Sequence, residues 1–281
     1  MKKVGIIAVA LIASFCGLLG GVAPAGGSAG VVVTVGDSYE VGAPIEKIPT
    51  LYTTCIRQKV QASEIVASGL GMISHNVACP SAKVSDVITG MLGQPPQLDA
   101  LNDPNVRVLR LTIGGNEGVS GIGNCLLTAN CTARYPSVVK AYSGLESLWD
   151  EQTHTGKLAT LYPLIRQRTN ARVLVEGYPV RVSDHPKSED DTGCLLVNSS
   201  ERALTNDLIT KMNAKIRSAA NYYGFTYVDP FEAGWFNADQ DACSTSPSKL
   251  INAFELPLPL HPTEAGVRTK AAHDLAILRA N

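Results

Sequence analysis

The sequence has no cluster of basic residues and no excess of charge of either sign. Its 281 residues include 24 Lys and Arg against 25 Asp and Glu, which gives a formal net charge of -1. Proteins that bind nucleic acids neutralise phosphates with a basic patch, and their affinity depends on it. The balanced composition therefore argues against a nucleic-acid partner.

The sequence also lacks internal repeats, low-complexity linkers and Cys-x-x-Cys pairs. Without a linker, and at this length, the chain is expected to form one domain with a sizeable core. Without paired cysteines or a Cys/His cluster, a structural zinc site is disfavoured. We therefore predict a single domain that needs no metal.

A long apolar run stands at the N-terminus, over residues 4–22, after Lys2 and Lys3 and before Ala23-Pro24-Ala25. This order is typical of a secretory signal peptide, with cleavage near residue 25 or 29. The alternative is an uncleaved membrane anchor, but small residues crowd the end of the run, where an anchor would stay bulky. We predict a signal peptide over residues 1–29 and a single exported domain over 30–281, with no membrane span and a net charge of -3.

Six cysteines remain after the predicted cleavage, because Cys16 leaves with the signal. An even number in an exported protein indicates three disulfides. Six cysteines allow 15 connectivities, so the sequence alone does not pair them. Sequential pairing is favoured because it joins neighbouring elements without crossing: Cys55 with Cys79, Cys125 with Cys131, and Cys194 with Cys243.

The apolar pattern alternates between strands and helices. Buried strands are predicted over residues 31–35, 106–113, 172–176 and 225–228, with a weaker one over 72–78. Helical spacing occurs over residues 54–68, 137–150, 158–168, 200–223 and 263–280. The alternation predicts an α/β domain with helices on both faces of a mostly parallel sheet of about five strands.

Ser38 follows the first predicted strand within Gly36-Asp37-Ser38-Tyr39-Glu40-Val41-Gly42. A strand that ends in a sharp turn carrying a hydroxyl suits a serine nucleophile, and the glycines permit such a turn. A turn held by an aspartate side chain is the simpler alternative. We interpret Asp37 as that structural acceptor.

Other polar segments occupy corresponding places later in the chain. In open parallel sheets, reactive groups collect where strands end, at the carboxyl edge. These segments are Cys79-Pro80-Ser81 after the weak strand, Gly114-Gly115-Asn116-Glu117 after residue 113, and His261-Pro262-Thr263-Glu264-Ala265-Gly266 near the C-terminus.

Together and in this order, the four segments resemble those of the SGNH (GDSL-type) hydrolases, and most of all the secreted actinobacterial lipases and esterases. The resemblance implies a flavodoxin-like three-layer α/β/α fold and three sequential disulfides. It also implies Ser38 as the nucleophile, His261 as the general base and Asn116 as an oxyanion donor. The backbone amides of Ser38 and Ser81 would supply the other donors.

Three residues depart from the family pattern. Ser81 stands where glycine is usual, and it can serve only if its backbone angles are ordinary. Glu117 stands where aspartate is common, a change expected in the supporting contacts. Leu258 stands three before His261, where the superfamily often has the triad aspartate. Its backbone carbonyl is our hypothesis for the group that orients His261, with Glu255 or Asp229 as displaced acids in the alternative.

The function expected from these residues is a secreted, monomeric esterase or lipase that cleaves carboxylic esters through an acyl-enzyme, on an ester or lipid substrate and without a cofactor. Phospholipase, thioesterase and polysaccharide or cell-wall deacetylase activities remain open on the same fold. From another class, the three departures leave open a catalytically weak secreted binding protein.

Overall fold

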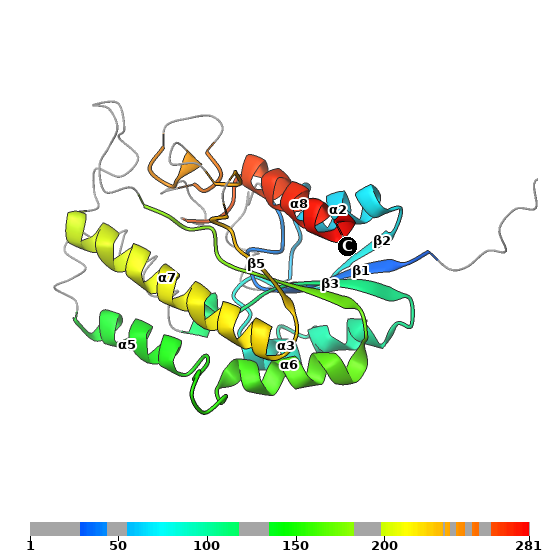
Figure 1. The fold of residues 1–281 in the computed structure, drawn as a ribbon, viewed down its shortest axis with the longest axis horizontal. Coiled ribbons are helices and arrows are strands. Elements are labelled where there is room, and N and C mark those ends of the chain that lie inside the picture. The colour runs from blue at the N-terminus through cyan, green and yellow to red at the C-terminus, as the bar shows by residue number, and fades with distance from the viewer. Residues whose placement is uncertain are drawn as a thin grey trace, which may run out of the picture.

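Five parallel strands form one sheet between two layers of helices (Figure 1). The computed structural model describes residues 29–43, 55–117, 135–182, 198–232, 234–236, 240–244, 249–252 and 260–280. The strand order β2-β1-β3-β4-β5 is that of flavodoxin-like folds. The predicted fold class is therefore confirmed.

The strands lie close to the predicted positions. They are β1 (Val31–Gly36), β2 (Ile73–Asn76), β3 (Val106–Thr112), β4 (Arg172–Glu176) and β5 (Thr226–Val228). All of β1 is buried, because helices cover both faces of a parallel sheet. The edge strand β2 alternates between exposed and half-buried residues, which accounts for its weak apolar pattern.

Helices cover both faces of the sheet (Figure 1). The first layer holds α2 (Ala62–Leu70) and α8 (Glu264–Arg279), and the second holds α3 (Val84–Thr89), α5 (Tyr135–Glu146), α6 (Lys157–Arg168) and α7 (Ser199–Tyr222). Thr263, predicted as a helix-start signal, is the N-cap of α8, and its hydroxyl accepts a hydrogen bond from the Gly266 N–H. Helix α3 and the short 3-10 turns η1 (Gln97–Asn102) and η2 (Gly115–Glu117) were not predicted, because segments of three to six residues show no clear period.

The helix predicted over residues 54–68 is wrong in its first half. Residues 55–61 are not helical, and α2 begins only at Ala62. Val60 pairs with Ala43 through two backbone hydrogen bonds of 2.9 and 3.1 Å, and Cys55 is bonded to Cys79. These contacts between segments far apart in sequence override the local helical spacing.

The first of the predicted disulfides, Cys55–Cys79, is present. Cys243 is also disulfide-bonded, while Cys125, Cys131 and Cys194 lie outside the described residues. Residues 1–28, which hold nearly all of the predicted signal peptide, lie outside them as well. Within the described ranges, no helix has the length and apolar character needed to cross a membrane.

Candidate active site

The turn that carries Ser38 depends on a glycine and a glutamine. Gly36 has a φ of 144°, and a Cβ there would lie 2.2 Å from the Thr112 carbonyl oxygen, so only glycine fits. The Gln97 side chain accepts a hydrogen bond from the Gly36 N–H at 2.7 Å and donates one to its carbonyl at 3.1 Å. The end of β1 is therefore held through both backbone polar groups of Gly36.

Ser38 and His261 meet although 223 residues separate them in the chain. The Ser38 Oγ lies 2.7 Å from the His261 Nε2, and Ser38 is 8 % exposed. A hydroxyl at this distance can pass its proton to a neutral imidazole.

The backbone of His261 is held by Asn252. The His261 N–H donates to the Asn252 Oδ1 at 3.1 Å, and the Asn252 N–H donates to the His261 carbonyl at 2.9 Å. The Leu260 N–H donates to the Asn252 carbonyl at 2.9 Å. The imidazole is thus presented from a short, tightly bonded segment that leads into α8.

Of the residues considered as orienters of His261, Leu258 and Glu255 lie outside the described residues. Asp229 follows β5 and forms an ion pair with Arg217 of α7. Its other oxygen accepts the Phe231 N–H at 2.9 Å. The Asp229 carboxylate is thus engaged with α7 and its own turn.

Asn116 and Ser81 lie in adjoining loops, because the Asn116 side-chain amide donates to the carbonyl of Ala82 at 3.0 Å. Ser81 has a φ of 64°, in the left-handed region, so its backbone angles are not ordinary. The expectation of ordinary angles is therefore wrong: Ser81 takes the left-handed conformation for which glycine is suited, so it can present its N–H as the family's usual glycine would. Within the described ranges, the backbone N–H groups of Ser38 and Ser81 donate to no protein acceptor.

Glu117, next to Asn116, has a side chain that is 3 % exposed and contacts the neighbouring helices. One carboxylate oxygen accepts the Val84 N–H at the start of α3 at 2.8 Å, and the other pairs with Lys157 of α6. The glutamate that replaces the family's usual aspartate therefore joins η2 to two helices.

Asp37 is a buried acceptor, as predicted. Its Oδ1 accepts the Tyr39 N–H at 3.0 Å, and its Oδ2 accepts the Tyr178 hydroxyl at 2.5 Å. Burial raises the pKa of the Asp37 carboxyl to about 7, although these two hydrogen bonds favour its charged form.

A cluster of five buried charges lies behind the Ser38 turn. Arg110 of β3 contacts Glu40 at 3.0 Å and both Glu176 and Asp274 at 2.8 Å, while Lys270 of α8 contacts Glu40 at 2.6 Å and Glu176 at 2.9 Å. Burial alone would raise the pKa of Glu40, but the two cations outweigh it and lower that pKa. Sequence reasoning missed this charge cluster, and Arg110 inside an apolar strand was the available signal.

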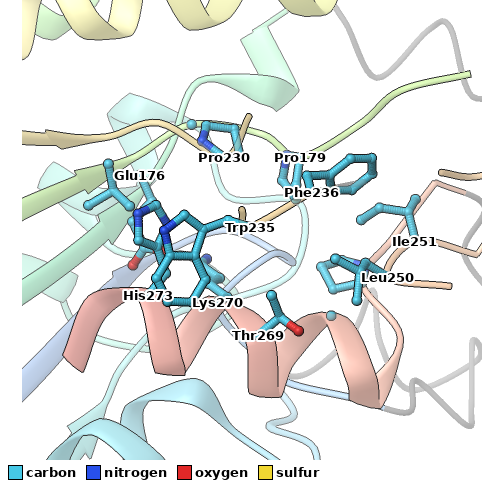
Figure 2. A pocket seen from close by; sticks show the side chains of 14 residues that line it. Glu176, Pro179, Pro230, Trp235, Phe236, Leu250, Ile251, Thr269, Lys270 and His273 are labelled. Carbon is cyan, nitrogen blue, oxygen red and sulfur yellow. The ribbon is translucent and has the colours of Figure 1, made fainter. Parts of the chain in front are cut away.

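A small cavity lies between α8 and the loops that follow β4 and β5 (Figure 2). Its volume of about 40 Å³ has room for a few waters rather than an acyl chain. Trp235 stacks on His273 with ring centroids 4.2 Å apart, and His273 hydrogen-bonds Glu232 at 3.0 Å. Neither Ser38 nor His261 lines the cavity, but Pro262, the residue after His261, does.

The fold and the arrangement of these loops correspond to the class of SGNH hydrolases. Residues 34–269 match the GDSL-like lipase/acylhydrolase family, so the chain belongs to that family and is a carboxylic ester hydrolase.

Related proteins come from Streptomyces. Lipase 2 of Streptomyces coelicolor is 25 % identical over 264 residues, which cover 88 % of this chain and 85 % of that protein. The extracellular lipase of Streptomyces rimosus has the same fold, with a TM-score of 0.67 at 22 % identity over 90 % of this chain and 99 % of that one. Phospholipase A1 of Streptomyces albidoflavus gives a TM-score of 0.66 at 24 % identity with the same coverage.

Proposed function

We propose that this protein is a secreted esterase or lipase in which Ser38 is the nucleophile and His261 the general base. The observation that carries the proposal is the 2.7 Å contact between the Ser38 Oγ and the His261 Nε2 at the carboxyl edge of the sheet. Membership of an ester-hydrolase family supplies the reaction to which this pair would be applied.

The reaction proceeds in two transfers. The His261 Nε2 takes the hydroxyl proton while the Ser38 Oγ attacks the ester carbonyl, and the imidazolium returns the proton to the departing alcohol. A water molecule then loses a proton to His261 and attacks the acyl-enzyme carbonyl. The imidazolium returns that proton to the Ser38 Oγ as the acyl–oxygen bond breaks, which releases the carboxylic acid and restores the serine. Each step needs only these two side chains and donors for the oxyanion.

Three donors are proposed for the oxyanion: the backbone N–H groups of Ser38 and Ser81 and the side-chain amide of Asn116. The two backbone groups have no acceptor in the described part of the chain. The Asn116 amide uses one hydrogen on Ala82 and keeps a second for the substrate. Losing one such donor costs about 2.7 to 4 kcal/mol of barrier.

The backbone carbonyl of Leu258 is our proposal for the group that orients His261. The engagement of Asp229 with Arg217 supports it by occupying one alternative acid. Leu258→Ala and Glu255→Gln are expected to keep most activity, since neither removes that carbonyl. Loss of activity in Glu255→Gln alone would make Glu255 the orienting acid.

Export is proposed from the N-terminal run, with residues 1–29 removed and 30–281 acting as a monomeric domain. The Cys55–Cys79 disulfide supports it, because such bonds persist in oxidising compartments. N-terminal sequencing of the secreted protein should begin near residue 26 or 30. A mature protein that still begins at Met1 would contradict export by cleavage.

The decisive experiment measures hydrolysis of nitrophenyl esters of graded chain length, together with a phospholipid substrate, and labelling by a fluorophosphonate. Wild type is expected to react in both assays and Ser38→Ala in neither. Ser63→Ala is the matched control, because Ser63 is also buried and its hydroxyl has no hydrogen-bond partner among the described residues. Equal labelling of wild type and Ser38→Ala would refute the proposal, and a folded wild type without turnover would favour a binding protein.

A further inference from the structure

Tyr178 lies where three neighbouring strands end, although no sequence motif marks it. It follows β4, while Asp37 follows β1 and Gly115 follows β3, and these strands are adjacent in the order β1-β3-β4. The Tyr178 side chain is buried, with 2 % of the residue exposed. A single side chain from the third strand therefore reaches the loops of the other two.

The Tyr178 hydroxyl joins those loops by two hydrogen bonds. It donates to the Asp37 Oδ2 at 2.5 Å and accepts the Gly115 N–H at 2.8 Å. Asp37 directly precedes Ser38, and Gly115 directly precedes Asn116. The hydroxyl is thus one residue away from the proposed nucleophile on one side and from the proposed oxyanion donor on the other.

The backbone of Tyr178 is fixed by Asn213 of α7. The Tyr178 N–H donates to the Asn213 Oδ1 at 2.8 Å, and the Asn213 amide donates to the Tyr178 carbonyl at 3.0 Å. The Tyr178 ring meets the Tyr39 ring edge-on at 4.7 Å. A Cβ on Gly115 would lie 2.9 Å from the Tyr178 ring, so the glycine is what lets the ring approach.

We propose that Tyr178 is a positioning residue, which sets the distance between the Ser38 turn and the Asn116 loop. This inference rests on the proposed function. The Gly115 N–H donates to the Tyr178 hydroxyl and is therefore not available to the substrate. Tyr178 would accordingly act through the positions of the two loops. Oxyanion donors lower the barrier only where they match the transition state, and small displacements of catalytic groups are costly in rate.

The first test is Tyr178→Phe in the mature protein, which keeps the ring and removes the hydroxyl. We expect kcat for a short nitrophenyl ester to fall at least tenfold, with KM changed less than threefold, because substrate binding is preserved. Tyr162→Phe is the matched control: Tyr162 is fully buried and its hydroxyl has no hydrogen-bond partner in the part of the chain that the structure describes, so kcat should change less than twofold. A Tyr178→Phe enzyme with wild-type kcat overturns the proposal.

A double-mutant cycle with Asp37→Asn provides the second test. If the Tyr178 hydroxyl acts through Asp37, kcat of the double variant should be close to that of the less active single variant. A fold-loss equal to the product of the two single fold-losses would overturn the coupling. Should Tyr178→Phe not fold, Asp37→Asn alone decides: a fivefold or larger loss of kcat supports the proposal, and an unchanged kcat overturns it. Ser38→Ala tested alongside separates the two ideas, because wild-type activity in that variant would refute the proposed function itself.

Discussion

The hydroxyl of Tyr39 donates a hydrogen bond to the carbonyl oxygen of Leu260 at 2.5 Å. The residue after Ser38 therefore holds the residue before His261. The Tyr39 ring also packs against the His261 imidazole, with centroids 4.8 Å apart. The contact between Ser38 and His261 is accordingly flanked by a second contact between their chain neighbours.

Tyr39→Phe should lower kcat about five- to thirtyfold and leave KM nearly unchanged, because the hydroxyl that restrains Leu260 is lost while the ring remains. Removing one such hydrogen bond is expected to cost about 1 kcal/mol of unfolding free energy. Steady-state kinetics and urea unfolding measure the two effects. Tyr222→Phe, at a tyrosine that is 55 % exposed, serves as control. An unchanged kcat in Tyr39→Phe would show that Asn252 alone holds the histidine segment.

Asp37→Asn should change the pH dependence of stability. Burial raises the pKa of Asp37 from 3.8 to about 7, so between these values the folded protein keeps a proton that the unfolded chain has lost. The free energy of unfolding therefore falls with rising pH in this window, by up to about 1.4 kcal/mol per unit. The asparagine variant has no such titration, so its unfolding free energy relative to that of wild type should rise by roughly 4 kcal/mol between pH 4 and 8. Urea unfolding across that range is the measurement, and parallel curves would contradict the raised pKa.

Ser81→Gly should keep kcat within about twofold and leave the unfolding free energy within about 1 kcal/mol, because relief at positive φ is offset by greater freedom of the unfolded chain. Ser81→Val should instead lower kcat at least tenfold, since a β-branched residue resists the 64° φ and would turn the N–H away. Leu92→Val is the control, because Leu92 has a φ of 51° in a turn outside the site. Equal kcat losses in both valine variants would assign the effect to stability alone.

Glu117→Ala should destabilise the fold by about 2 kcal/mol, because the Val84 N–H loses its acceptor. It should also lower kcat about tenfold by loosening the neighbouring Asn116. Glu117→Gln keeps an oxygen for Val84 and loses only the charge opposite Lys157, so both effects should be much smaller. Thermal unfolding and ester hydrolysis of the two variants compare these outcomes. A glutamine variant as impaired as the alanine variant would show that the ion pair matters more than the helix contact.

The strands could be predicted because a buried parallel strand leaves a continuous apolar run, as in β1 and β3. The edge strand β2 gave a weaker pattern because half of its side chains face solvent. Residues 55–61 were misjudged because their conformation is decided by Ala43 and Cys79, which are distant in sequence. Local periodicity does not indicate contacts with residues that are distant in sequence.

Candidate site residues were predictable where they stand in a motif beside a strand, as Ser38 and Asn116 do. The residues that position them were not. Gln97, Asn252 and Tyr178 act across strand ends and loops, and their roles exist only once those segments meet. A sequence pattern indicates each strand and the turn that follows it, but the distances between turns depend on the order of the strands in the sheet.

The five buried charges that include Arg110 link the Ser38 turn, β3, β4 and α8 in one cluster. Removing one member of a buried ionic group leaves its partners uncompensated, whereas replacing the whole group with apolar residues of similar volume is often tolerated. Over evolutionary time these positions should consequently change together or not at all. Among diverging relatives we expect either the complete set of charges or its concerted replacement, and few sequences with four of the five.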